Sequence, residues 1–384
     1  MRNVLVSLEK NWGEKMRFIH FSDCHLGYYQ YGIKERADDF MKSFSTMMKG
    51  KGDFMLISGD FFHQRQVDPN TVYRAIEELK KPKEKGMPVY VIPGNHDKHL
   101  KNMSWLQFIA KSGYITLIEN GFVDHDENTR IFGFVTYEDF EKYIEKVGEL
   151  DTISGYNIMM LHEGIEGHIP GEGITMDQVQ TIKEQGIDYL ALGHIHSPYD
   201  IGGWVYNPGS LERTSISDNI GCAYLVNTEH VDTDKFVNCK KHDVRKIYKV
   251  VINVTNKTDD EIRKEIKERT KDNEPEGILS LKFEGKVERI FNAKEFAPDV
   301  FHVLIANDTT FKSSPIDIKD VDDIEGEVIR QVTKGRPDIR KLILELKDTT
   351  GELKPDEIME IVRKAESGDE NAIRDTKTKE RVIR

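Results

Sequence analysis

Five short polar motifs each follow an apolar, strand-like segment and open a loop. They are Asp23-Cys24-His25, Gly59-Asp60, Gly94-Asn95-His96-Asp97, Leu161-His162-Glu163-Gly164 and Gly193-His194-Ile195-His196. Each one alone is ordinary, because an aspartate or histidine at a strand end is more often part of a turn or a hydrogen-bonded core residue than a metal ligand. The Gly-His-x-His pair is more specific, since alternate residues of an extended segment point the same way. Together the motifs predict carboxylate, carboxamide and imidazole groups at one edge of a sheet.

These ligand types suit a hard-to-borderline divalent cation, with Mn²⁺ first and Mg²⁺, Fe²⁺ or Zn²⁺ as substitutes. Thiolate ligands are missing from the set, which disfavours a structural zinc site. Two cations about 3.5–4 Å apart need a bridging anion, and Asp60, central among the motifs, is the natural bridge. Such a pair would clamp a phosphate and lower the pKa of a water nucleophile. The sequence contains no Gly-x-Ser-x-Gly motif that would supply a protein nucleophile instead.

The elements that must position these motifs alternate between strand and helix. The strands are expected at 17–22, 54–58, 89–92, 115–118, 131–135, 157–161, 189–192, 204–206 and 223–226. Phe40, Phe44, Met47 and Met48 have helical spacing, Asp68-Pro69 opens a helix, and residues 105–110 form another. This alternation predicts an α/β layered fold with at least one mixed sheet, in which ligands sit beyond the carboxyl ends of the strands.

The pattern changes near residue 245. Strands at 246–254, 278–283 and 303–306 with a charged helix at 259–270 predict a small α+β domain. From about residue 313, amphipathic segments such as Val321/Ile324/Val328 are separated by polar links, which is typical of partner-binding helices. A flexible tail with frayed helices is the alternative. Met16 stands directly before the first strand, so residues 1–15 are a candidate disordered leader, and either Met1 or Met16 is a candidate start.

Composition excludes several classes of protein. The 384 residues carry a net charge of −12, with 38% hydrophobic and 32% charged residues, so a packed core is expected. No run approaches the roughly 18 apolar residues of a membrane span, and the N-terminus has no apolar signal region. The three cysteines, Cys24, Cys222 and Cys239, are odd in number and lack CxxC spacing. We therefore expect no disulfide framework and a reducing, cytoplasmic location.

The five motifs, as a set, resemble the calcineurin-like metallophosphoesterase superfamily over residues 16–226. The segments FIHFSDCHLGYYQY, ISGDFFH, ALGHIH and NPGSLER are similar, more narrowly, to the nuclease subunit of the double-strand-break repair complex, the SbcD type, in its archaeal form. The resemblance implies two mixed β-sheets flanked by helices for residues 16–243 and a DNA-binding capping domain for residues 244–312. It also implies that residues 313–384 are a linker and helical segment that docks on an SMC-like ABC ATPase of the SbcC type.

The resemblance also implies roles for individual residues. Metal ligands would come from Asp23, His25 and His196 for the first ion and from Asn95, His162 and His194 for the second, with Asp60 as the bridge. His96 would contact the scissile phosphate and assist the leaving oxygen, and His63 would orient the substrate strand. The sequence departs from the family at Asn207, where an aromatic residue is expected before Pro208.

DNA contacts are expected near these motifs, because an acidic protein needs local positive charge to bind a polyanion. The candidates are Tyr28, Tyr29, Arg65, Lys98 and Arg213. The tyrosines could stack on bases or pack the loop, and the basic residues could be ordinary surface charges. Two predicted helices carry more apolar surface than one buried face needs, through Val72/Ile76/Leu79 and Trp105/Leu106/Phe108/Ile109. The family that the sequence resembles dimerises through helices in these positions. Core packing accounts for at least one face of each.

The sequence thus favours a Mn²⁺-dependent DNA nuclease, with exonuclease and endonuclease activity at broken ends, working in the nucleoid as a homodimer with the ATPase. A metallophosphoesterase that hydrolyses nucleotides or other small phosphodiesters is the alternative. A scaffold that bridges DNA ends, with incidental cleavage, is the third possibility.

Overall fold

The computed structural model describes residues 15–98, 103–167, 173–230, 237–287 and 291–311. The candidate leader, apart from Lys15, and the helical segment at 313–384 lie outside the described residues. The chain divides into two compact units, the first formed by residues 1–253, 257–284 and 292–308 and the second by residues 254–256, 285–291 and 309–384. The sheets and helices that carry the polar motifs belong to the first unit.

Two six-stranded mixed sheets form the centre of this unit. The first has the order β12-β11-β1-β2-β3-β4, and the second has the order β5-β6-β7-β8-β10-β9. The first sheet contains β1 (Arg17–Phe21), β2 (Phe54–Ser58), β3 (Val89–Ile92), β4 (Thr116–Leu117), β11 (Ala223–Asn227) and β12 (Val237–Lys240). The second contains β5 (Gly121–Asp126), β6 (Thr129–Phe134), β7 (Tyr156–Leu161), β8 (Tyr189–Leu192), β9 (Tyr199–Ile201) and β10 (Val205–Asn207). Strands β1 to β4 are parallel, as are β6, β7, β8 and β10, while β11 and β12 and the edge strands β5 and β9 are antiparallel to their neighbours.

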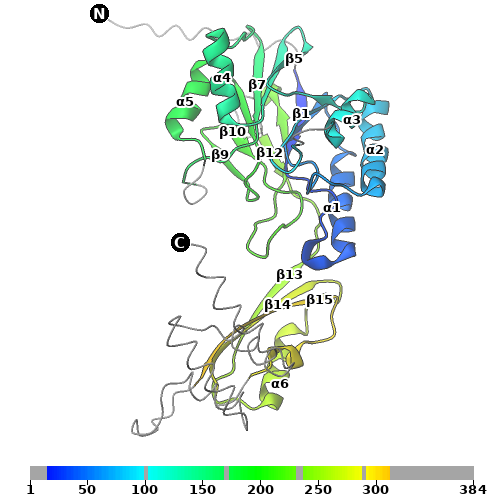
Figure 1. Ribbon diagram of the computed structural model, residues 1–384, viewed down its shortest axis with the longest axis vertical. Coiled ribbons are helices and arrows are strands. Elements are labelled where there is room, and N and C mark those ends of the chain that lie inside the picture. The colour runs from blue at the N-terminus through cyan, green and yellow to red at the C-terminus, as the bar shows by residue number, and fades with distance from the viewer. Residues whose placement is uncertain (1–14, 99–102, 168–172, 231–236, 288–290, 312–384) are drawn as a thin grey trace, which may run out of the picture. The chain divides into compact units, whose positions relative to one another are not determined.

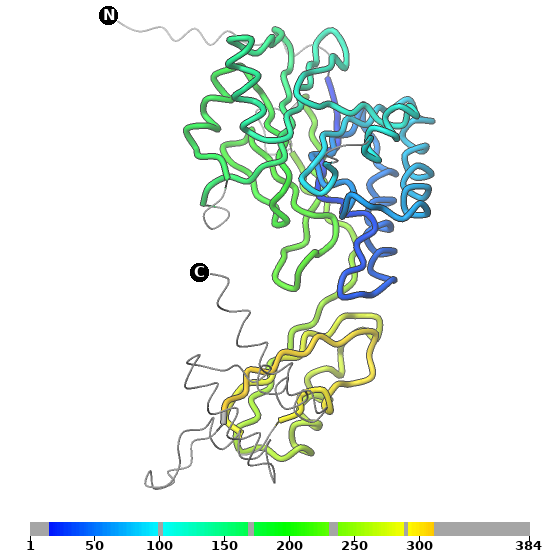
Figure 2. Tube along the Cα trace, viewed as in Figure 1, coloured from blue at the N-terminus to red at the C-terminus, as the bar shows by residue number. Residues whose placement is uncertain are grey.

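Helices cover the outer face of each of these two sheets, so the two sheets and their helices form four layers (Figure 1). On the first sheet lie α1 (Lys34–Met47), α2 (Pro69–Glu84) and α3 (Trp105–Lys111), and on the second lie α4 (Tyr137–Val147) and α5 (Met176–Glu184). The 3₁₀ turns are η1 (Gln30–Gly32), η2 (Thr228–His230) and η3 (Ala293–Phe296). The path of the chain through these layers can be followed along the Cα trace (Figure 2). The predicted α/β layered fold is confirmed.

Burial explains why the central strands are apolar throughout. Along β2, Met55 and Ile57 pack toward the helices, whereas Phe54 and Leu56 pack between the two sheets. Successive side chains of a strand point to opposite faces, and here both faces are covered. The strand therefore reads as a continuous hydrophobic run, FMLIS, rather than an alternating one.

The predicted helix start at Asp68-Pro69 is confirmed. The Asp68 side chain accepts a hydrogen bond from the Thr71 backbone N–H at 3.0 Å, and Pro69 occupies the first helical position. Helices α4 and α5 and strands β5, β9 and β12 were not predicted. Residues of β5 and β12 are largely exposed, and α4 and α5 each have only two buried residues, Tyr137 and Phe140 in α4 and Val179 and Ile182 in α5.

The cysteines require a correction. Cys222 and Cys239 form a disulfide, with Cα atoms 5.5 Å apart, because β12 pairs with β11 and brings the two residues together. The expectation from the odd cysteine count was wrong, since the pairing depends on a strand that the sequence pattern did not reveal. Cys24 is a buried free cysteine, consistent with a packing role.

The predicted strand and helix segments after residue 245 are also found. Strands β13 (Ile247–Asn253), β14 (Ile278–Val287) and β15 (His302–Phe311) form a sheet in that order, and α6 (Asp259–Thr270) connects the parallel strands β13 and β14. Ile262 and Ile266 form the buried face of α6. In the second unit, the Lys286 backbone N–H donates to Thr255 Oγ1 at 2.9 Å. The domain boundary at 243/244 stays a prediction. Within the described part of the chain, no helix combines the length and the apolarity that crossing a bilayer requires.

A buried histidine between the sheets makes stability depend on pH. His20 is fully buried, and its ring contacts the Tyr189 hydroxyl and the Leu192 carbonyl at 3.0 and 3.1 Å. Burial lowers the pKa of His20 from 6.5 to about 3. Between pH 6.5 and about 3, His20 is therefore protonated in the unfolded chain but not in the folded chain. The free energy of unfolding falls as the pH falls through this range. The slope from this one group is about 1.4 kcal/mol per pH unit.

We expect this slope to disappear in a His20→Gln variant. Chemical denaturation of the metal-free protein between pH 4.5 and 7.5 measures it, as the difference between the two stability curves. Parallel curves for the wild type and the variant would show that His20 is not the group responsible.

Candidate metal centre

The polar motifs lie together because five parallel strands end at the same place. Within the first sheet, Phe21 pairs with Ile57 and Ser58 with Ile92, and within the second, Leu161 pairs with Leu192. The residues that follow these positions therefore emerge side by side. The two sheets are joined at this edge by His162 Nδ1, which lies 2.8 Å from the Ser58 carbonyl oxygen. The convergence predicted from the sequence is present.

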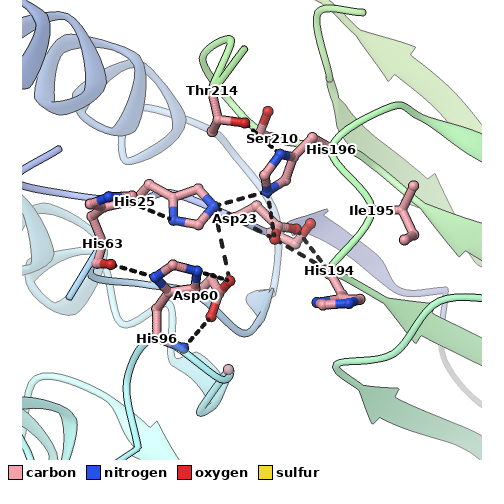
Figure 3. A network of polar contacts seen from close by, with 12 residues as sticks. Asp23, His25, Asp60, His63, His96, His194, Ile195, His196, Ser210 and Thr214 are labelled. Carbon is pink, nitrogen blue, oxygen red and sulfur yellow. Dashed lines mark hydrogen bonds and ion pairs between the residues drawn. The ribbon is translucent and has the colours of Figure 1, made fainter. Parts of the chain in front are cut away.

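The first group contains Asp23, His25 and His196, whose potential ligand atoms all lie within 4.8 Å of one another (Figure 3). His25 Nε2 is 3.1 Å from His196 Nε2, and His196 Nε2 is 3.9 Å from Asp23 Oδ1. Asp23 and His25 are buried, while the His196 side chain is 30% exposed. These three residues are the set predicted for the first ion.

The second group surrounds Asp60. Its Oδ2 lies 3.3 Å from His162 Nε2 and 3.9 Å from His25 Nε2, so one carboxylate reaches both groups. Asn95 Oδ1 lies 3.1 Å from His162 Nε2. Asp60 thus occupies the central position that a bridging ligand requires.

His194 joins the site through its backbone as well as its ring. Its N–H donates to both carboxylate oxygens of Asp23, at 3.2 and 3.1 Å, and its ring packs edge-on against His162 with centroids 5.2 Å apart. Ile195, the residue between the two histidines, points away from Asp23 (Figure 3). The backbone is not the extended segment assumed from the sequence, because β8 ends at Leu192 and His194 has a φ of 80°.

Four of the predicted ligands have left-handed backbone conformations. The φ angles of Asp23, His25, Asp60 and His194 are 50°, 44°, 48° and 80°. Non-glycine residues rarely adopt such angles; each costs of order 1–3 kcal/mol and persists only because the surrounding structure enforces it. The strain is concentrated where the chain turns sharply from a strand into the site, which is a common property of functional centres.

His63 and His96 stand beside His25. The three ring centroids are 5.1–5.4 Å apart, and His63 Nδ1 lies 3.5 Å from His25 Nδ1. The Nδ1 atom of His96 donates to the His63 carbonyl oxygen, which leaves Nε2 facing the site, 3.9 Å from Asp60 Oδ2. The His96 side chain is 36% exposed, so a ligand entering from solvent can reach it.

The electrostatics of the site follow from burying two carboxylates among imidazoles. Burial raises the pKa of Asp23 and lowers the pKa of His25. Burial also opposes the charged forms of Asp60 and His162, but their mutual attraction outweighs it, lowering the pKa of Asp60 and raising that of His162 to about 9. Without a cation, Asp60 is therefore ionised and His25 neutral, whereas His162 holds a proton near neutral pH that a bound cation would have to displace.

Asp97 closes the Gly94-Asn95-His96-Asp97 motif, and only the structure reveals its positioning role. It is buried and accepts hydrogen bonds from the backbone N–H groups of Phe61, Phe62 and Gly94 at 3.0, 2.9 and 3.0 Å. Burial raises its pKa to about 7. By tying the loop after β2 to the loop after β3, Asp97 holds Asp60 near Asn95.

The candidate DNA-contact residues are placed as follows. Tyr28 stacks on His63, with centroids 3.6 Å apart and an interplanar angle of 20°, so loop packing accounts for one face of its ring. Tyr29 and Arg65 are exposed and Lys98 is half-buried. Arg213 Nε donates to the Asp218 carbonyl oxygen at 3.3 Å. Their role in binding DNA stays a prediction.

Gly94 is needed because nothing larger fits beside Asp60. A Cβ atom at this position would lie 2.1 Å from Asp60 Oδ1 and 2.3 Å from the Asp60 backbone nitrogen. We expect Gly94→Ala to displace Asp60, to weaken Mn²⁺ binding at least tenfold, and to cost about 1–3 kcal/mol of stability. Titration calorimetry with Mn²⁺ and thermal unfolding measure the two effects.

Gly121→Ala is the matched control, because a Cβ atom there meets nothing within 4 Å. We expect it to bind Mn²⁺ like the wild type. Equal Mn²⁺ affinity in both variants would refute the packing argument for Gly94.

The donor set fits two divalent cations. Two aspartates, one asparagine carboxamide and four histidines meet at this edge, where Asn95 is exposed and the other six are buried or half-buried. Asp23 belongs both to the group with His25 and His196 and to a group with Asp60 and His162, and Asp60 also reaches His25. Oxygen and imidazole ligands in this proportion favour Mn²⁺, Fe²⁺ or Zn²⁺ over Ca²⁺. The assignment of each residue to an ion belongs to the proposal below.

Comparisons with known proteins agree with this geometry. Residues 16–198 match the family of calcineurin-like phosphoesterases. The chain is 28% identical to the DNA double-strand break repair protein Mre11 of Archaeoglobus fulgidus over 53% of this chain and 52% of that protein. It is 30% identical to the Methanococcus maripaludis protein of the same name over 53% of this chain and 59% of that one. The Haloferax volcanii protein is 24% identical over 94% of this chain and 80% of its own length.

The chain thus spans little more than half the length of the first two relatives. The family match coincides with the part of the chain that carries β1 to β8 and all seven predicted ligands. With its two mixed sheets and its converging aspartates and histidines, the chain is similar, through residues 16–198, to the calcineurin-like phosphoesterases.

Proposed function

We propose that this protein is a Mn²⁺-dependent DNA nuclease, with exonuclease and endonuclease activity, that processes the ends of double-strand breaks. The observation that carries the proposal is the meeting of the two predicted ligand groups at Asp60, with His96 beside them. The Mre11 relatives, which are DNA double-strand break repair proteins by name, support DNA as the substrate.

Asp23, His25 and His196 would hold one cation, Asn95, His162 and His194 the other, and Asp60 would bridge them. When bound, the two cations would neutralise the phosphodiester charge and lower the pKa of a water nucleophile. The protein must keep these ligands ionised or unprotonated. The low pKa values of Asp60 and His25 help to do so near neutral pH, whereas His162, with a pKa of about 9, must release a proton before it can bind a cation.

His96 would assist the leaving oxygen. Because its Nδ1 is engaged with the His63 carbonyl oxygen, Nε2 is the nitrogen that can exchange a proton with the substrate. His63, stacked between Tyr28 and the His96 ring, would orient the substrate strand. Both side chains are partly exposed, as substrate-facing groups must be.

The net charge of −12 is compatible with a DNA substrate only if positive charge is local. Arg65, Lys98 and Arg213 lie in loops near the metal motifs, and we propose that they contact the phosphate backbone. We further propose that residues 244–312 are a capping domain that also binds DNA. Its strands and α6 support a folded unit there.

We propose that the protein is a homodimer in the cytoplasm, associated with the nucleoid and with an SMC-like ABC ATPase. Most of the apolar residues predicted on α2 and α3 are core residues, but Tyr73, Met103 and Phe108 are 61%, 51% and 40% exposed. This exposed surface supports dimerisation through α2 and α3. The amphipathic spacing within residues 313–384 supports docking on the ATPase, and truncation at residue 313 tests it by co-elution.

Hydrolysis of defined substrates tests the proposal. The purified chain should cleave linear single- and double-stranded DNA with Mn²⁺, more weakly with Mg²⁺, and not with chelator. Cyclic nucleotides and other small phosphodiesters are assayed beside the DNA. If the small phosphodiesters are hydrolysed and the DNA is not cleaved, the protein is instead a small-molecule phosphoesterase.

A further inference from the structure

The outer nitrogen of His196 meets a hydroxyl group that the sequence motifs did not include. Whereas Nε2 faces Asp23 and His25, Nδ1 contacts Thr214 Oγ1, in the loop between β10 and β11 (Figure 3). Thr214 Oγ1 in turn donates to Asp218 Oδ2 at 2.7 Å. The three side chains form a line that leads away from the metal centre.

The direction of the hydrogen bonds in this line is fixed. A carboxylate only accepts, so the single hydroxyl proton of Thr214 points to Asp218. The hydroxyl oxygen must then accept from His196, which places a proton on Nδ1 and leaves the lone pair of Nε2 directed at Asp23 and His25. A metal-binding imidazole needs this tautomer.

Asp218 is itself held by its own loop. Its Oδ2 accepts the backbone N–H groups of Thr214 and Ser215 at 3.1 and 2.8 Å, and its Oδ1 accepts the Ser215 hydroxyl at 2.7 Å. The carboxylate therefore has little freedom to turn away from Thr214. Its Oδ2 is also only 3.6 Å from His196 Nδ1.

The backbone that carries His196 is fixed independently. Asn207 is fully buried, and its Nδ2 donates to the carbonyl oxygens of Ile195 and Ser197 at 2.7 and 2.9 Å. The Ser210 N–H donates to the His196 carbonyl oxygen at 3.0 Å. Asn207 is the position at which the sequence departs from the expected aromatic residue, and an aromatic side chain could not make these two bonds. The segment 207–218 thus holds both the ring and the backbone of His196.

We propose that Thr214 and Asp218 are positioning residues that hold His196 in its Nδ1-protonated form, and so set the metal affinity of the site formed by Asp23, His25 and His196. This inference rests on the proposed function, because it requires His196 to be a ligand. Among the described residues, no hydrogen bond joins Thr214 or Asp218 to the ligands of the second site, Asn95, His162 and His194. Loss of Thr214 or Asp218 should therefore affect one ion and spare the other.

Calorimetric titration of the full-length, metal-free chain with Mn²⁺ tests this inference. The wild type should bind two ions. Asp218→Asn and Thr214→Val should each weaken one binding step by about 10–100-fold, the range for loss of an outer hydrogen-bond partner of a metal ligand. The other step should stay within about twofold, and Thr214→Ser should recover wild-type affinity because it keeps the hydroxyl.

Ser217→Ala is the matched control, since the Ser217 hydroxyl contacts Ser215 in the same loop and, among the described residues, makes no hydrogen bond to His196 or to the Asp218 carboxylate. Thermal unfolding of the metal-free variants shows that each is folded. The role assigned to Thr214 and Asp218 is wrong if the wild type binds two ions and Thr214→Val and Asp218→Asn bind both with the same affinity. It is also wrong if Thr214→Ser loses as much Mn²⁺ affinity as Thr214→Val. A wild type that binds no Mn²⁺ would remove the proposed function and this inference with it.

Discussion

Replacing Asp60 with asparagine is expected to reduce DNA cleavage by about 10³-fold or more and to lower the Mn²⁺ content below two per chain. Asparagine keeps the size of the side chain and can still accept the N–H of His96, which Asp60 Oδ1 accepts at 3.0 Å. It removes the charge that reaches both His25 and His162. A metal pair contributes several kcal/mol to transition-state stabilisation, and about 4 kcal/mol corresponds to a factor of about 10³ in rate.

Metal analysis after dialysis and cleavage of an end-labelled duplex measure the two effects. Asp38→Asn is the control, because Asp38 is 56% exposed and pairs with Arg74 on the surface. Two tightly bound ions in Asp60→Asn, with cleavage close to that of the wild type, would disprove the bridging role.

Replacing His96 with alanine is expected to separate chemistry from metal binding. We expect Mn²⁺ content to stay at two per chain while cleavage falls by about 10²–10⁴-fold, the usual contribution of a general acid or base. The reason is geometric: His96 Nε2 lies 3.9 Å from Asp60 and faces the site, but its ring is partly exposed and its Nδ1 is bound to His63. The ring is therefore available to substrate without being needed to assemble the ligand groups.

Single-turnover cleavage with saturating Mn²⁺ measures this effect, with metal analysis on the same sample. His125→Ala serves as the comparison, since His125 packs against Phe54 and Tyr90 away from the ligand groups. Retained cleavage in His96→Ala would show that another group serves the leaving oxygen.

The parts of the site that follow an apolar strand were predictable from the sequence. Buried parallel strands are recognisable as runs such as FMLIS, and their carboxyl ends must meet at one edge of a sheet. The sequence therefore predicts that Asp23, Asp60 and His162 lie close together. The resemblance to a known family then divided the ligands between two ions.

The residues that hold these ligands in place could not be predicted in the same way. Asp97 ties together two loops by accepting hydrogen bonds from backbone N–H groups. Almost every residue has such a group, so the residue types of the partners do not reveal the contact. Thr214 and Asp218 lie in a loop with no periodic pattern, far in sequence from most of the ligands. The disulfide between Cys222 and Cys239 depends on the pairing of the short, exposed strand β12.

The sequence by itself determined which chemical groups this protein brings to its centre, because strand periodicity and loop position are local properties that neighbouring residues encode. Only the tertiary structure decided which nitrogen of each histidine faces inward, which carboxylate stands between the two groups, and which loop holds His196. Those choices depend on contacts between residues that are far apart in the chain, such as the 2.8 Å contact between His162 Nδ1 and the Ser58 carbonyl oxygen, which joins the two sheets, and local sequence patterns do not encode such contacts.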